Sequence, residues 1–411
     1  MANLDRKRAQ RLMAEAGIDA LVLFSPEAFR HATGAPAGVA TMWRRAGAVA
    51  VLVPADPGLP ETAVVSDLFA PGFRQASHIA DIRESPIWVE ALTLPDARMD
   101  APAAAQMVTL WQAAGRPPGN ARPETFDAGV CYRHLADALA EKGLGGARIG
   151  IESEAVSARS LPALAEALAP ARLVDATDVA RGLRAVKTAA EIAHLRAAVT
   201  VAETGIAAVR DAIAPGVSRS DLAKVWQAAI DERAAGLPMT GAWEYISVGD
   251  DPWGGDAVAR RGDLVKVDVG CLMDGYTSDT GRTFVVGQPS RIQADLYAAL
   301  LAGFEAGLPL LRHGTPLSEV HRVTQAAIRA RGFPGYSRGH FGHSLGTGPG
   351  SEEWPFISAS ADTLIEPGMV LAFECPLYVT GVGGLIIEDQ VEITADGPAP
   401  MNRLSRDLVA C

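Results

Sequence analysis

Cysteine is scarce in this chain of 411 residues, which contains only Cys131, Cys271, Cys375 and Cys411. The four are scattered and none forms a Cys-x-x-Cys pair, so the sequence predicts free thiols in a reducing compartment rather than a disulfide framework. No base motif accompanies Cys271 or Cys375. We therefore interpret both as small buried apolar residues and not as nucleophiles.

An excess of positive charge and long apolar runs are also lacking. There are 37 Lys and Arg residues against 48 Asp and Glu, a net charge of −11. This balance argues against nucleic acid and against anionic membrane surfaces, which both need basic residues. No apolar run approaches the roughly 18 residues of a membrane span, and residues 1–17 are too charged for a signal peptide. We expect a soluble, cytoplasmic protein.

The length favours two domains, because a single core rarely serves so many residues. Short apolar runs bounded by turn residues alternate with helical patterns over the first part of the chain, which predicts a small α/β domain over 1–172. The strands expected there are 20–24, 48–53, 61–65 and 149–151, and the helices are 5–17, 132–142 and 161–168. The Pro- and Ala-rich segment 83–125 has poor periodicity and is interpreted as a long insertion or lid.

From residue 173 to 411 the pattern predicts an α+β catalytic domain, in which long helices are followed by groups of strands. The expected helices are 191–213, 219–235, 292–312 and 316–331. The expected strands are 264–269, 283–286, 369–373 and 384–394.

Two aspartates lie close to a predicted turn of this second domain. Asp268 closes the apolar run that begins at Leu264, and Asp279 follows eleven residues later, after the turn signal Asp274-Gly275. A hairpin there would bring the two carboxylates side by side on neighbouring strands. A buried carboxylate costs several kcal/mol unless it is paired or bound to a metal, which makes the pair a candidate metal site.

Three further residues complete a set of metal-binding side chains. His343 lies between glycines in the run Gly342-His343-Ser344-Leu345-Gly346, and Glu374 and Glu388 each end an apolar run. Four carboxylates and one imidazole are the ligands that two divalent ions prefer, and bridging carboxylates would hold the ions about 3.5–4 Å apart.

The order and spacing of these five residues resemble the metal motif of the creatinase/prolidase/methionine aminopeptidase family. Supporting pieces are Arg184-x-x-Lys187-x-x-x-Glu191, Gly262-Asp263-Leu264-Val265 and Glu366-Pro367-Gly368-Met369. The resemblance implies a pita-bread catalytic domain preceded by a creatinase-type α/β domain. It also implies two divalent ions (Mn, Fe, Co or Zn, of which we expect manganese), a homodimer, and a small-molecule or dipeptide substrate.

The sequence departs from the family where peptidases carry two further histidines. No histidine precedes Asp268 at the usual distance, and alignment on Glu-x-Pro puts Glu352 in the place of the second one. We therefore predict Glu352 as a catalytic acid or base, together with Glu374. His340, Trp253 and Trp354 are predicted to bind substrate.

Three functions remain open from the sequence. The first is a dinuclear metallohydrolase that cleaves an amide-type C–N bond in a small polar substrate, as an Xaa-Pro dipeptidase does. The second is a metal-dependent lyase of the same fold, similar to dimethylsulfoniopropionate lyases, in which Glu352 would abstract an α-proton. The third is a non-catalytic binding module.

Overall fold

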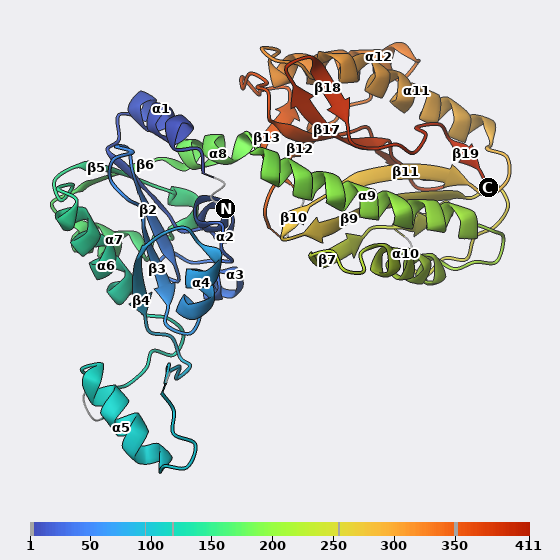
Figure 1. The fold of residues 1–411 in the computed structure, drawn as a ribbon. Helices are drawn as coiled ribbons and strands as arrows, with labels where there is room; N and C mark the ends of the chain where they lie inside the picture. The colour runs from blue at the N-terminus through green and yellow to red at the C-terminus, as the bar shows by residue number, and fades with distance from the viewer. Residues whose placement is uncertain (1–3, 95, 117–118, 254, 349–351) are drawn as a thin grey trace. The chain divides into compact units, whose positions relative to one another are not determined.

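The protein is described by a computed structural model that covers residues 4–94, 96–116, 119–253, 255–348 and 352–411. The described chain forms two compact units, residues 1–183 and 184–411 (Figure 1). The domain boundary predicted between residues 172 and 173 falls in strand β6 (Arg172–Asp175) and stays a prediction.

Unit 1 is built on a mixed sheet of six strands in the order β4-β3-β2-β1-β5-β6. Besides β6, the strands are β1 (Ala20–Leu23), β2 (Ala50–Pro54), β3 (Thr62–Ser66), β4 (Asp81–Ser85) and β5 (Arg148–Ile151). The helices are α1 (Arg6–Ala16), α2 (Pro26–Thr33), α3 (Val39–Trp43), α4 (Ala70–Ala76), α5 (Ala103–Ala113), α6 (Ala128–Glu141), α7 (Leu161–Leu168) and α8 (Thr177–Ala185). This confirms the α/β arrangement that the sequence predicts.

Both faces of the unit 1 sheet are covered, because side chains alternate between the faces of a strand. Leu21 and Leu23 of β1 pack with residues of α1, α2, α4 and α8. Ala20 and Val22 pack on the other face with residues of α6 and α7. Strand β1 is therefore buried along its whole length, which explains its continuous apolar sequence.

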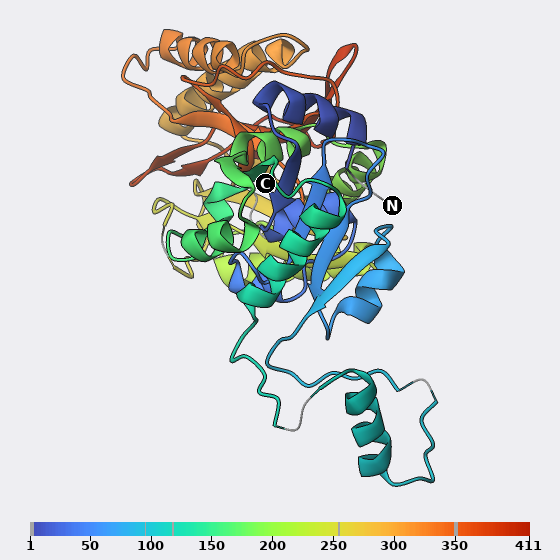
Figure 2. The ribbon, with the colours of Figure 1, turned by 90° about the vertical axis from the view of Figure 1, so that its left-hand side faces the viewer.

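Helix α5 lies within the segment that the sequence marks as an insertion. None of its residues is buried, and both views show it apart from the six-stranded sheet (Figures 1 and 2). Its sequence, AAAQMVTLWQA, contains no charged residue. Residues 95, 117 and 118 of the predicted insertion lie outside the described residues.

Unit 2 contains a large curved sheet whose central order is β10-β9-β11-β17-β14-β12-β13. The strands of the unit are β7 (Met239–Glu244), β8 (Ser247–Val248), β9 (Leu264–Met273), β10 (Tyr276–Thr277), β11 (Thr280–Val285), β12 (His340–Ser344), β13 (Glu353–Ser358), β14 (Val370–Glu374), β15 (Leu377–Val379), β16 (Gly383–Leu385), β17 (Glu388–Thr394), β18 (Gly397–Pro400) and β19 (Val409–Ala410). Its helices are α9 (Ala189–Ala212), α10 (Arg219–Arg233), α11 (Arg291–Gly307) and α12 (Leu317–Ala330).

Most of the unit 2 core lies in two clusters, and a smaller third cluster joins α9 to β14. Residues of α9 and α10 pack on β9, whereas those of α11 and α12 pack on β14 and β17. By length and composition α9 could cross a membrane, but half of its most apolar window is buried inside the protein, as in the core helix of a globular domain. The predicted α+β arrangement of this unit is confirmed.

Two predicted strands differ from those observed. Asp268 does not end its strand, because β9 continues to Met273 and pairs there with both β7 and β10. The predicted strand 384–394 is divided into β16 and β17, with Ile386 and Ile387 between them. The division lets β16 pair with β15 while β17 pairs with β14, so one apolar run serves two sheets.

Candidate metal centre

The five predicted ligands come from neighbouring strands of the unit 2 sheet. Asp268 on β9 is paired with Gly281 on β11, and Gly281 is paired in turn with Glu388 on β17. Glu388 is also paired with Glu374 on β14. Three of the carboxylates therefore lie in one row across four strands.

A tight turn brings the fourth carboxylate to this row. Asp274 and Gly275 both have positive φ angles, 46° and 75°, which a two-residue hairpin turn requires. The turn joins β9 to β10, and Asp279 follows directly before β11. The hairpin predicted from the Asp-Gly signal is therefore confirmed.

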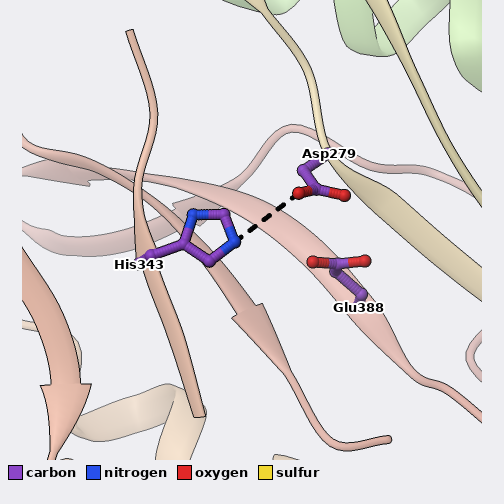
Figure 3. Close-up of side chains that lie close together, drawn as sticks. All are labelled: Asp279, His343 and Glu388. Atoms are coloured by element: carbon purple, nitrogen blue, oxygen red, sulfur yellow. Dashed lines mark ion pairs between the residues drawn. The ribbon is translucent and has the colours of Figure 1, made fainter. Parts of the chain in front are cut away.

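Asp279, His343 and Glu388 form the closest group of the centre. One ligand atom from each lies within 4.8 Å of the others, and all three side chains are buried (Figure 3). His343 Nε2 lies 3.5 Å from Asp279 Oδ2. His343 Nδ1 donates a hydrogen bond to the Ser344 carbonyl, 2.9 Å away, which fixes the ring and directs Nε2 toward the carboxylates.

The electrostatics of this group suit a cation. Burial raises the pKa of Glu388 well above its usual value, and the neighbouring Asp279, Glu374 and Asp268 add to the rise. Glu388 Oε2 is among the few described side-chain atoms that are buried without a hydrogen-bond partner. Burial also lowers the pKa of His343, which favours the neutral imidazole that binds metals. A divalent ion would satisfy the unpaired oxygen, so these residues fit the metal that the sequence implies.

Asp268 and Glu374 differ from that group because each is paired with a cation of the protein. Lys266 Nζ lies 3.1 Å from Asp268 Oδ2, and an Arg338 guanidinium nitrogen lies 2.6 Å from Glu374 Oε1. Burial raises the pKa of Glu374 and Arg338 opposes the rise. Sequence reasoning missed both cations. Lys266 carried a signal, since it interrupts an apolar run two residues before Asp268 and therefore shares its face of the strand.

The predicted acid Glu352 lies at the edge of the centre. Its Oε2 is 3.9 Å from His340 Nε2, and His340 Nδ1 is 3.8 Å from Glu374 Oε1. Burial lowers the pKa of His340, and Arg338 lowers it further. The neighbouring Glu353 is buried and pairs with Arg184 at 2.8 Å instead. Adjacent acids thus have separate surroundings, and Glu352 is the one that faces the histidine.

Aromatic side chains border the same centre. Trp253 is 61% exposed, and its ring lies 4.8 Å from that of Tyr378 and 6.1 Å from that of Tyr245. Burial raises the pKa of Tyr378, and Asp268 and Glu374 add to the rise, so this phenol is neutral. Trp354 is half-buried and packs against the apolar core of unit 2. The substrate roles of Trp253, Trp354 and His340 stay predictions.

A buried ion network fixes the strand that carries Glu388. Arg282 is 2% exposed and donates hydrogen bonds to the Glu388 carbonyl and to the Asp389 carboxylate. It also donates to the carbonyls of Leu404 and Ser405, and Arg406 pairs with the other oxygen of Asp389. Arg282 therefore anchors the ligand strand to residues 404–406.

Comparison with known proteins agrees with this architecture. The sequence profile of metallopeptidase family M24 matches residues 193–395, and that of the creatinase/prolidase N-terminal domain matches residues 71–186. The Xaa-Pro dipeptidase of Pyrococcus furiosus is 32% identical over 240 residues, which cover 56% of this chain and 67% of that protein.

Two relatives extend the likeness over nearly the whole chain. The Mycobacterium bovis protein named Probable dipeptidase PepE is 29% identical over 90% of this chain and 97% of its own length. The structure of an Xaa-Pro dipeptidase from Bacillus anthracis superposes with a TM-score of 0.75 and covers 99% of both chains. At 21% identity the latter likeness shows the fold alone.

Fold and profile matches together define a two-domain metallohydrolase, with a creatinase-type N-terminal domain and a pita-bread catalytic domain. The chain belongs to metallopeptidase family M24 and is of its creatinase/prolidase type. It is therefore an enzyme, and the alternative hypothesis of a non-catalytic binding module is wrong.

Proposed function

We propose that the protein is a dinuclear metal-dependent hydrolase that cleaves an amide-type C–N bond in a small polar substrate, with Xaa-Pro dipeptides as the first class to test. The observation that carries this proposal is the group of Asp279, His343 and Glu388, in which a buried carboxylate oxygen lacks a hydrogen-bond partner. The likeness to an Xaa-Pro dipeptidase supports the choice of substrate.

In this proposal, Asp268, Asp279, His343, Glu374 and Glu388 hold two divalent ions, for which manganese, iron, cobalt and zinc all suit the oxygen and nitrogen ligands. When bound, such ions polarise a carbonyl group and activate water for attack. The low pKa of His343 keeps its ring available as a ligand near neutral pH. The row of paired strands keeps the carboxylates at fixed spacing.

Glu352 transfers the proton in the proposed reaction. It lies beside His340 at the edge of the centre, and its side chain is half exposed, so substrate and water reach it. In the neutral state expected from its lowered pKa, His340 can accept a proton or donate a hydrogen bond to substrate oxygen. Glu374, the other predicted catalytic residue, is held by Arg338 and serves mainly as a ligand.

Aromatic rings at the border of the centre supply the proposed substrate surface. Trp253 and Tyr378 face one another at 4.8 Å, beside the strand of Asp268. Strand alternation puts Trp354 on the same side of β13 as Phe356, whose ring is 5.4 Å from that of His340. A small substrate with an apolar ring and polar ends, such as an Xaa-Pro dipeptide, matches these surroundings.

A lyase is the second candidate, because an acid occupies the position where the family's peptidases carry a histidine. In that reaction the ions would hold a substrate carboxylate while Glu352 removes the α-proton. A homodimer in the cytoplasm completes the proposal, with the segment 83–125 as the part that would reach the partner's site.

The test combines metal analysis with a substrate panel. Purified protein should contain transition metal and should hydrolyse at least one member of a panel of dipeptides and small amides in a chelator-sensitive manner. Solvent deuterium should not enter the α-position of the substrate during hydrolysis, whereas a lyase would exchange it. Protein that binds no divalent metal would contradict the proposal in either form.

A further inference from the structure

Lys266 is a charged residue at the centre of an apolar strand. Its side chain is fully buried, and it stands on β9 two residues before the proposed ligand Asp268. Its ammonium nitrogen lies 3.1 Å from Asp268 Oδ2 and 3.8 Å from the centre of the Tyr245 ring. The Tyr378 ring is also near, with its centre 5.2 Å away.

The contacts of the Lys266 ammonium compensate the burial of a positive charge. A buried ammonium is costly unless an anion and polar contacts compensate it. Asp268 supplies the anion, and the faces of two tyrosine rings supply further attraction for a cation. The same ammonium reduces the negative charge that Asp268 presents to a metal ion.

The two sides of the metal centre therefore differ. Asp279, His343 and Glu388 approach within 4.8 Å, and Glu388 Oε2 is buried without a hydrogen-bond partner. Among the residues that the structure describes, Asp268 is not part of this close group, and its Oδ2 accepts a hydrogen bond from the Lys266 ammonium. An ion that takes Asp268 Oδ2 as a ligand must displace Lys266 from that oxygen.

We propose that Lys266 is a built-in counter-ion of Asp268, a positioning residue that makes metal binding strongly unequal. One divalent ion binds tightly at Asp279, His343 and Glu388. A second ion, on the Asp268 side, binds only when it displaces the ammonium. This inference rests on the proposed metal centre and deepens it. It states that Lys266, which is not a ligand, determines how tightly the second ion binds.

The experiment titrates metal-free protein with Mn²⁺ by calorimetry, at one pH and ionic strength, and compares wild type with Lys266→Met and Lys266→Arg. In wild type the second Mn²⁺ should bind at least about tenfold more weakly than the first. Lys266→Met should strengthen the second binding event by about tenfold or more and leave the first unchanged. Lys266→Arg keeps the positive charge and should behave as wild type does.

Thermal unfolding gives a second readout that does not depend on activity. Lys266→Met leaves Asp268 without its partner, so the metal-free variant should melt below wild type, and saturating Mn²⁺ should raise its melting temperature more than that of wild type. The matched control is Lys224→Met, because Lys224 pairs with Asp221 on the surface of α10. It should change neither quantity.

The outcomes separate this inference from the proposed function. If wild type binds no Mn²⁺, the metal centre itself is wrong. If wild type and a folded Lys266→Met bind two ions with the same pair of affinities, only the role of Lys266 is overturned. Should Lys266→Met fail to fold, Asp268→Asn takes its place and should lose the weak ion while the tight ion keeps its affinity. Loss of both ions in that variant would overturn the inference.

Discussion

Glu152 in unit 1 and Glu388 in unit 2 are both buried glutamates, but their surroundings are opposite. Glu152 accepts hydrogen bonds from the backbone nitrogens of Phe24 and Ser25, at 3.2 and 2.9 Å, and from the Ser25 hydroxyl at 2.6 Å. Glu388 is buried with one oxygen unpaired and with its pKa raised by burial and by neighbouring carboxylates. Burial alone therefore does not mark a functional carboxylate. The marker is a buried charge whose surroundings do not compensate it.

The largest expected effect comes from exchanging each glutamate for glutamine. Glu388→Gln should reduce kcat/KM more than about 100-fold, since even the partners of metal ligands contribute 10- to 100-fold. Bound metal should fall in parallel by elemental analysis. Glu152→Gln should instead lower the free energy of unfolding by about 1–3 kcal/mol, as loss of a satisfied buried hydrogen-bond acceptor does, while kcat/KM is kept. If both folded variants lost activity equally, the distinction between a structural Glu152 and a metal-binding Glu388 would be wrong.

Glu352 and Glu353 extend the comparison to adjacent residues. Glu352→Gln should lower kcat by roughly 10²–10⁴-fold, the range for one general acid–base group, with metal content unchanged. The pH profile should lose one limb. Glu353→Gln breaks the buried pair with Arg184 and should act mainly on the melting temperature. If Glu352→Gln keeps near-full kcat, then Glu352, which replaces a histidine of the family's peptidases, has no acid–base role in this protein.

The raised pKa of Glu388 predicts how stability depends on pH without metal. A carboxyl whose pKa is higher in the folded state stabilises the fold fully below its unfolded pKa, near 4.5, and loses this contribution as the pH rises through the folded value. Metal-free Glu388→Gln should therefore gain stability over wild type as the pH rises from 4.5, by about 1.4 kcal/mol per unit of pKa shift. Chemical denaturation at several pH values measures this difference. If the difference in the free energy of unfolding between variant and wild type does not change with pH, ionised Glu388 does not destabilise the fold.

The smallest expected effect concerns the exposed aromatic surface. Trp253→Ala should raise KM about 2- to 10-fold and leave kcat nearly unchanged, because an aromatic contact contributes about 0.5–1.5 kcal/mol to uniform binding. Ile292→Ala, at an exposed position of α11, is the matched control and should leave both constants as they are. A change in kcat alone would place Trp253 in the chemical step instead.

Local patterns were sufficient to predict the hairpin and the fold classes of both units. The Asp274-Gly275 turn needs positive φ angles, and few other dipeptides supply them, so its position was visible in the sequence. The five proposed ligands could be named because Asp268, Glu374 and Glu388 end apolar runs, Asp279 follows the turn signal, and the spacing of all five matches a known family.

Residues that act across the fold were not predictable in the same way. Arg338 lies in a loop, and only the pairing of β12 with β14 brings its guanidinium to Glu374. The length of β9 depends on its partners β7 and β10, which a single strand pattern does not show. Helix α5 was missed because its residues are not buried, so its sequence carries no apolar stripe of the usual kind.

The anchor of the Glu388 strand has a consequence for the order of events during synthesis. Arg282 and Asp389 bind partners at residues 404–406, which follow all five proposed ligands in the chain. While these residues are still inside the ribosome, Arg282 and Asp389 are without those partners and the ligand strand is not fixed. We therefore expect the metal centre to be completed only after residues 404–406 have emerged, even though all five proposed ligands precede them in the chain.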